Sequence, residues 1–313
     1  ALKKLLGLII LFAQITVWSQ NSDSSRIDIL TESEREQLDH SIFETPQEFL
    51  KAVISFGKSH NDRGNFEHAT LLFSAVLEYA SIRNLNEIVV SCHINLGHAH
   101  LNKSEHDLAL VQYYAALNKS EQFNLTSSKG TAYNSIGNAM FKQKQYDKAL
   151  EYYFMAIEIR SANNNLAGMA STYNGIGAVY NKKNELEESK KFILKSLELK
   201  ASLEDENGIA VSNKNLGSIY YKQQDYLTAL NHYFESLKFE RKINKRSGMA
   251  SSYFNIGIAH YSLNEIDKST KYIDSSLVLA HSIGYMNGVL QALDALSEIH
   301  ENSGKLDLAL ENY

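Results

Sequence analysis

The sequence predicts an all-α protein, a right-handed α-solenoid of antiparallel helix pairs. A glycine recurs every 40 residues along most of the 313-residue chain, small and bulky residues recur at fixed distances from that glycine, and proline occurs once. Self-similarity at a fixed period in this range is typical of solenoids, in which each repeat contacts only its neighbours. The near absence of proline favours long helices.

The recurring glycine marks the first helix of each repeat. It occupies Gly57, Gly97, Gly137, Gly177, Gly217 and Gly257, with Ser297 in the seventh place. A bulky or polar residue stands four positions before it and three positions after it, as Tyr133 and Met140 do around Gly137. Offsets of i, i+4 and i+7 share one helical face, so the pattern predicts a helix with a large–small–large stripe.

A second stripe begins twelve residues after the glycine and predicts a second helix. In the third repeat it consists of Ala149, Tyr153 and Ala156, again at i, i+4 and i+7. Small residues on both helices let the two backbones approach closely. Neither helix can bury its stripe alone, so each repeat is expected to be an antiparallel pair that needs a neighbouring repeat.

Turns are expected between these helices. Polar segments such as "KQKQYD" separate the two helices of a repeat, and "TPQE" at Thr45–Glu48 predicts an N-cap, a proline at the first helical position and a capping box. Further glycines, also 40 residues apart, lie between the repeats: Gly168, Gly208, Gly248 and Gly288. We expect them to supply the left-handed residue that ends a helix.

The chain is expected to contain three segments. Residues 1–19 read as a signal peptide, because Lys3 and Lys4 precede an apolar run at 5–18 and Ser19 follows it. As a helix the run spans roughly 21 Å, which is short against about 30 Å of hydrocarbon, although an uncleaved anchor stays open. Residues 20–45 are a charged leader or partial cap, and residues 46–313 form seven 40-residue repeats, the last truncated.

Composition argues against several function classes. A net charge of −5 argues weakly against nucleic-acid binding through this segment. Cys92 is the sole cysteine, which excludes an internal disulfide and a cysteine-based zinc cage and favours a small buried hydrophobe. Four histidines share one repeat position, which we interpret as a packing position, because equivalent residues about 8–10 Å apart cannot share an ion: His60, His100, His260 and His300.

Catalytic motifs are not recognisable in these residues. No serine, histidine and carboxylate set has a meaningful spacing, and the glycines stand singly instead of forming a phosphate-binding loop. We therefore expect no enzyme, no cofactor and no metal site here. A catalytic output domain after Tyr313 stays open, because the sequence stops inside the second stripe of the last repeat.

The pattern resembles the tetratricopeptide repeat family. The resemblance covers residues 46–313 and is carried by the small positions Gly137 and Ala149, with Tyr133, Ile136, Tyr153 and Ala156, and by their 40-residue echoes. The usual period of that family is 34, and a period of 40 is closer to HEAT or armadillo arrays, so another α-solenoid is the alternative. The six extra residues are expected to lengthen the second helix and its exit loop.

The resemblance implies that the first helices line an inner groove. Its ligand positions lie three before, one after, four after and five after the glycine. Carried onto the third to fifth repeats, they give the predicted peptide-binding residues Asn134, Asn138, Lys142, Asn174, Asn181, Lys182, Lys214, Ser218, Tyr221 and Lys222. Lysines beside asparagines favour an acidic peptide or protein as the partner. The alternative is that these residues only keep the repeats soluble.

The expected function is therefore protein or peptide binding outside the cytoplasm. Architectures of this kind resemble the exported N-terminal arrays of bacterial sensor and regulator proteins. That analogy implies the extracytoplasmic sensory or adaptor part of a larger membrane-linked signalling protein. The alternative is a free-standing periplasmic scaffold or assembly factor without an output domain.

Overall fold

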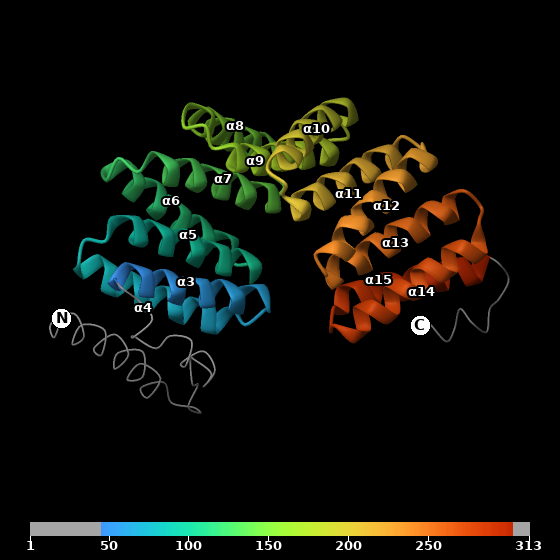
Figure 1. Ribbon diagram of the computed structural model, residues 1–313, viewed down its shortest axis with the longest axis horizontal. Coiled ribbons are helices and arrows are strands. Elements are labelled where there is room, and N and C mark those ends of the chain that lie inside the picture. The colour runs from blue at the N-terminus through green and yellow to red at the C-terminus, as the bar shows by residue number, and fades with distance from the viewer. Residues whose placement is uncertain (1–44, 303–313) are drawn as a thin grey trace. The chain divides into compact units, whose positions relative to one another are not determined.

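The structure is a computed structural model and describes residues 45–302 (Figure 1). Three expected features lie outside the described residues: the signal peptide at 1–19, nearly all of the leader at 20–45, and the second helix of the seventh repeat. Those expectations therefore stay predictions.

Within residues 45–302 the chain is all-α and contains no strand, which confirms the predicted fold class. Each helix is 17 residues long and a new one begins every 20 residues, so a pair repeats every 40. The helices are α3 (Pro46–Asp62), α4 (Phe66–Ile82), α5 (Asn86–Asn102), α6 (His106–Gln122), α7 (Thr126–Lys142), α8 (Tyr146–Ala162), α9 (Leu166–Lys182), α10 (Leu186–Ser202), α11 (Glu206–Lys222), α12 (Tyr226–Lys242), α13 (Arg246–Ser262), α14 (Ile266–Ser282) and α15 (Met286–Asn302).

The helices form two compact units, each with its own core. Unit 1 contains α3 to α8 and ends at Asn164, and unit 2 contains α9 to α15 and begins at Asn165. Within each unit, every helix contacts the next one along the chain, and the first helices of successive repeats also touch. This is the neighbour-to-neighbour packing that a solenoid requires.

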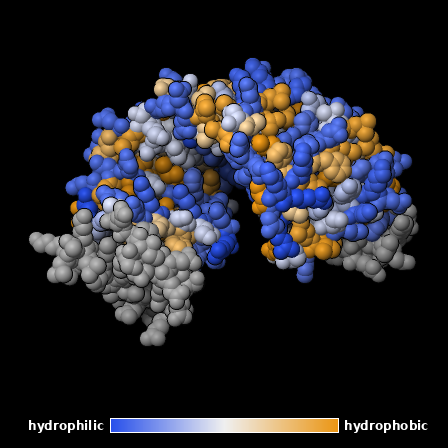
Figure 2. All heavy atoms as spheres, in the orientation of Figure 1, coloured by the Kyte–Doolittle hydropathy of each residue, from blue (hydrophilic) through white to orange (hydrophobic). Residues whose placement is uncertain are grey.

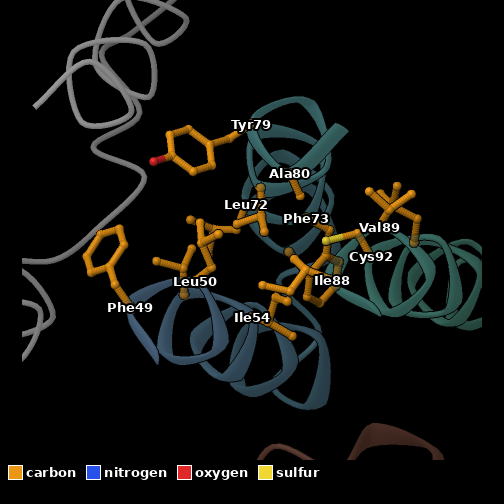
Figure 3. Packing of buried hydrophobic residues seen from close by; sticks show 14 of the residues in the cluster. Phe49, Leu50, Ile54, Leu72, Phe73, Tyr79, Ala80, Ile88, Val89 and Cys92 are labelled. Atoms are coloured by element: carbon orange, nitrogen blue, oxygen red, sulfur yellow. The ribbon is translucent and has the colours of Figure 1, made fainter. Parts of the chain in front are cut away.

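The core of unit 1 shows how the stripes are buried. Figure 3 shows Leu50 and Ile54 of α3, Leu72 and Phe73 of α4, and Cys92 of α5 converging between the three helices. Burial raises the pKa of the Cys92 thiol to about 12, so the side chain stays protonated at neutral pH. The expectation that Cys92 is a small buried hydrophobe is confirmed.

The predicted close approach at the recurring glycines is also confirmed. A Cβ atom on Gly137 would lie 2.7 Å from the ring of Tyr153, and one on Gly177 would lie 2.6 Å from Cγ1 of Ile193. Both distances are shorter than any normal contact, so a side chain at these positions would force the two helices apart. The bulky residue of the second helix therefore packs against the recurring glycine of the first helix and leaves no room for a side chain there.

The helix connectors do not use glycine as expected. The middle residue of every connector is left-handed, but only Gly64 and Gly284 are glycines; the others are Asn84, Ser104, Asn124, Lys144, Asn164, Asn184, Glu204, Gln224, Asn244 and Asn264. The role predicted for Gly168, Gly208, Gly248 and Gly288 is wrong, because each is the third residue of a helix. At Gly208 and Gly248, an added Cβ would meet the flexible ends of the Lys200 and Glu240 side chains of the preceding helix, which would have to shift.

The start of α3 follows the sequence prediction. The Glu48 N–H donates to Thr45 Oγ1 at 3.2 Å and the Thr45 N–H donates to Glu48 Oε2 at 3.1 Å, while Pro46 is the first helical residue. This capping box satisfies two backbone donors that a helix start leaves without partners.

Candidate functional site

We call the ten predicted ligand-binding residues the inner row. The structure places them on the first helices α7, α9 and α11, where three lysines are exposed and the others are half-buried. The three residues on α7 belong to unit 1 and the seven on α9 and α11 belong to unit 2. Hydrogen bonds link α9 to α11, so the structure brings residues of the unit 2 part together.

In unit 1, the asparagines of the inner row bond to the second helix of their own repeat. Asn138 Oδ1 accepts a 2.7 Å hydrogen bond from the Tyr153 hydroxyl, and Asn134 Oδ1 accepts one of 3.2 Å from Arg160 Nη1. Arg160 is 6% exposed, and its burial lowers its pKa to about 10. These two amides therefore serve packing inside unit 1, while Lys142 is exposed.

In unit 2, the inner row joins successive first helices. Asn215 Nδ2 donates to Asn174 Oδ1 at 2.7 Å, and Lys222 Nζ donates to the backbone oxygen of Asn181 at 2.7 Å. The Tyr221 hydroxyl lies 2.8 Å from Ser262 Oγ on α13. Polar side chains at this surface therefore hold α9, α11 and α13 in register.

Lys214 does not offer the free positive charge that binding of an acidic partner requires. Its Nζ lies 2.7 Å from Oε1 of Glu240, which is only 1% exposed and accepts a 2.6 Å hydrogen bond from the Ser252 hydroxyl. The sequence pattern could not reveal this pairing, because Glu240 lies in the last turn of a second helix, where charges are usually solvated. The ion pair compensates the charge of Lys214 within unit 2.

Lys182 and Lys222 are the two exposed lysines of the inner row in unit 2. Partial burial and the neighbouring charge of Lys182 both lower the pKa of Lys222. Among the described residues, no carboxylate lies within ion-pair distance of either ammonium. The two like charges are therefore uncompensated in a chain whose net charge is −5.

A cavity of about 430 Å³ opens on the first helices of unit 1. Its lining comes from α3, α4, α5 and α7: Lys58, Asn61, Asp62, Phe73, Ser91, Ile94, Asn95, His98, Ser127, Ser128 and Thr131. Lys58, Asn61 and Asp62 stand one, four and five residues after Gly57, which are positions that sequence analysis singled out in later repeats. The prediction missed this site because it applied those positions to the third to fifth repeats only.

The cavity is polar and its charges are not paired with each other. Lys58 and Asp62 are exposed, and neither forms an ion pair with any residue of the described range. Burial, and to a smaller extent the charge of Lys58, lowers the pKa of His98 to about 4, so its ring is neutral at pH 7. The His98 Nε2 atom lies 3.2 Å from Ser135 Oγ, which fixes the ring.

The repeated histidine position has a packing role, as the sequence predicted. His60 and His260 are buried; the ring of His260 stacks on Tyr272, and its Nδ1 atom lies 2.6 Å from Glu265 Oε2. Within residues 45–302, no three His, Cys, Asp or Glu side chains are arranged to hold a metal ion.

No helix of that range combines the length and apolar character that crossing a bilayer requires. Figure 2 shows hydrophilic residues over much of the visible face, interrupted by hydrophobic patches.

Models of known protein families match two segments of the chain. The tetratricopeptide repeat family model matches residues 130–163, and a second model of that description matches residues 168–242. The matched helix pairs, from α7 to α12, are tetratricopeptide repeats. Comparison with curated proteins finds no match.

The family match also locates the six extra residues of each tetratricopeptide repeat. The matched segment 130–163 starts four residues inside α7 and ends one residue after α8. The extra residues therefore fall in the connector and in the first turn of the next first helix. In this matched repeat they do not lengthen the second helix, whereas their place in its exit connector agrees with the expectation.

Solved structures with tetratricopeptide-type solenoids share this fold at low sequence identity. The Rap conjugation gene regulator of the plasmid pLS20, in complex with the Phr* peptide, is 15% identical, with a TM-score of 0.66 over 99% of this chain and 82% of that chain. NprR in complex with its cognate peptide NprX is 15% identical, with a TM-score of 0.62 over 97% and 87%. BtubC from P. vanneervenii is 16% identical, with a TM-score of 0.55 over 75% and 92%.

Proposed function

We propose that this chain is a protein- or peptide-binding scaffold, and that an acidic segment of its partner lies along α9 and α11 of unit 2. The uncompensated pair of Lys182 and Lys222 carries the proposal. Two neighbouring ammonium groups repel each other in the free protein, and a carboxylate placed between them is attracted by both, which offsets that repulsion. An anionic ligand therefore gains more at this point than at an isolated surface lysine.

The surroundings of the lysine pair suit a peptide. Ser218 is half-buried on α11, four residues before Lys222, and therefore offers a hydroxyl group on the same helical face. Two of the solved structures with the same fold, NprR and the plasmid pLS20 regulator, contain bound peptides. Those structures show that a solenoid of this kind is able to hold a peptide, which supports the same class of partner here.

The expected affinity is modest and depends on salt. An exposed ion pair contributes only about 0–1 kcal/mol, and a hydrogen bond to a charged group contributes about 1.5–3 kcal/mol where water is partly excluded. Raising the salt concentration from 0.1 M to 1 M shortens the screening length from about 10 Å to about 3 Å, so binding should weaken.

The test measures binding of a fluorescent acidic peptide panel to residues 46–313. The double variant Lys182→Glu with Lys222→Glu should bind the best peptide at least about tenfold more weakly. The matched control, Lys191→Glu with Lys238→Glu, makes the same change in net charge at exposed positions of α10 and α12 and should bind like the wild type. Equal loss in both variants, or binding that strengthens with salt, would contradict the proposal.

We also propose that the scaffold is exported and serves as the extracytoplasmic sensory or adaptor part of a larger signalling protein. The lysines and the apolar run at 5–18 support export. A reporter enzyme that is active only outside the cytoplasm, fused after Tyr313, should be active, and Ile10→Arg in the apolar run should abolish that activity. Coding sequence after Tyr313 that contains an apolar run of about 20 residues followed by a catalytic or DNA-binding domain would favour the sensory role over a free-standing scaffold.

A further inference from the structure

The cavity of unit 1 presents two opposite charges on one helix. Lys58 and Asp62 both line it, and they are the charged side chains of its described lining. Side chains four residues apart on a helix lie about 5–6 Å from each other at Cβ, so a lysine and an aspartate at this spacing are able to pair. Here they do not, and both charges face the cavity without a partner among the described residues.

Uncharged polar groups and an apolar surface complete the lining. The side-chain oxygen Oδ1 of Asn61 is buried and accepts no hydrogen bond within the described residues. Hydroxyl groups of Ser127 and Ser128 line the α7 side, whereas Phe73 and Ile94, which are 1% and 7% exposed, supply apolar surface. The site thus offers an ammonium, a carboxylate, an unsatisfied acceptor and room for a small apolar group.

These features restrict the ligand by charge and by length. A ligand that satisfies both charges carries a carboxylate and an ammonium about one helical turn apart, and a turn rises 5.4 Å. An extended chain covers at most about 3.6 Å per residue, which gives about 7 Å for two residues and about 11 Å for three. Among these lengths, a dipeptide matches one helical turn best. The volume of about 430 Å³ lies in the lower part of the range of small-molecule sites.

We propose that the unit 1 cavity binds a dipeptide with free ends, its carboxylate at Lys58 and its ammonium at Asp62 and Asn61 Oδ1. One side chain of the ligand lies against Phe73 and Ile94. This site is separate from the peptide site proposed on the inner row of unit 2, because its residues lie on other helices.

Titration calorimetry with a panel of dipeptides tests the inference on residues 46–313. The best dipeptide is then compared with its N-acetyl form, its C-terminal amide, the corresponding free amino acids and a tripeptide. Blocking either end, or changing the length by one residue, should weaken binding at least about tenfold. Blocked forms that bind as well as the free dipeptide would overturn the proposal, and so would a complete panel with no dissociation constant below about 10 mM.

Substitutions at the two charges locate the site. Lys58→Gln and Asp62→Asn are exposed and conservative in size, so circular dichroism should show an unchanged fold, and each should weaken dipeptide binding about tenfold or more. Lys51→Gln, at an exposed position of α3 outside the cavity, is the matched control. Wild-type binding by both cavity variants would refute the assignment. The Lys182→Glu with Lys222→Glu variant should bind the dipeptide normally, which separates this result from failure of the proposed function.

Discussion

The first helices of unit 1 and unit 2 carry the same repeat pattern, but they satisfy their polar groups differently. In unit 2, Asn215 donates to Asn174 across successive first helices. In unit 1, the equivalent Asn95 faces the position of Ile54, which accepts no hydrogen bond, and Asn95 Nδ2 instead donates back to the Ser91 backbone oxygen at 2.7 Å. These neighbours thus bond to each other in unit 2, whereas in unit 1 they do not, and Asn95 lines the cavity.

The positions four and five residues after the glycine show the same contrast. In unit 2, Tyr221 bonds to Ser262 of the next repeat. In unit 1, Asn61 and Asn102 occupy these positions, no hydrogen bond joins their side chains, and Asn61 Oδ1 is left without a partner. The repeat register decides which residues face this surface. The pair of residues 41 apart decides whether they are available to a ligand.

The largest expected effect breaks the internal bonding of unit 2. Lys214→Ala leaves the buried carboxylate of Glu240 without its ion pair, and breaking a buried pair from one side costs about 3–5 kcal/mol. Lys58→Ala in unit 1 removes an exposed lysine without an ion-pair partner and should change the unfolding free energy by less than about 0.5 kcal/mol. Urea unfolding followed by circular dichroism measures both.

A double substitution provides the control for that experiment. Lys214→Met with Glu240→Leu removes both charges and should recover most of the lost stability, because paired burial of charge contributes little net free energy. If Lys214→Ala and Lys58→Ala have equal effects, then Lys214 is a free surface lysine that is available to an acidic partner, as the sequence analysis expected.

The sequence was sufficient for the fold because the fold depends on single positions that repeat. Gly137 and Tyr153 are small and large partners at a fixed spacing, so their contact follows from helical periodicity alone. The polar contacts of the candidate site depend instead on pairs of residues that lie on different helices. That Glu240 is buried, or that Ile54 cannot accept a bond from Asn95, requires the three-dimensional pairing of residues on different helices. The cavity was missed for a different reason: the ligand positions were applied to the third to fifth repeats only, although Lys58, Asn61 and Asp62 occupy the same positions in the first repeat.

The second prediction concerns the pH dependence of the unfolding free energy, which we expect His98 of unit 1 to control in part. His98 has a pKa of about 4 in the folded protein and about 6.5 when unfolded, so between these values the unfolded chain binds the extra proton. The contribution of His98 to the free energy of unfolding is fully present above pH 6.5. It is lost as the pH falls towards 4, with a slope of at most about 1.4 kcal/mol per pH unit. His98→Gln should flatten the profile, as measured by urea unfolding from pH 7 to pH 4.

The equivalent experiment in unit 2 sharpens that prediction. Partial burial lowers the pKa of His232 as well, but the charge of Glu235 opposes the shift. His232→Gln should therefore flatten the pH profile less than His98→Gln. The reverse order would mean that the surroundings of His98 do not exclude its charged form.

The smallest effects are expected at two connectors whose middle residues, Gly64 and Glu204, are both in the left-handed conformation. Gly64 in unit 1 has φ 84°, and a Cβ atom added to it would meet no other atom within 4 Å, whereas Glu204 in unit 2 has φ 53°. A residue with a Cβ in the left-handed region costs about 1–2 kcal/mol, and glycine offsets part of this through the larger entropy of the unfolded chain, about 0.4–1 kcal/mol. Gly64→Ala should therefore destabilise the protein, and Glu204→Gly should stabilise it, each by about 0.5–1 kcal/mol. Thermal and urea unfolding of both variants measure the two signs. Two changes of the same sign would show that side-chain contacts, and not backbone conformation, set the energy of the connectors.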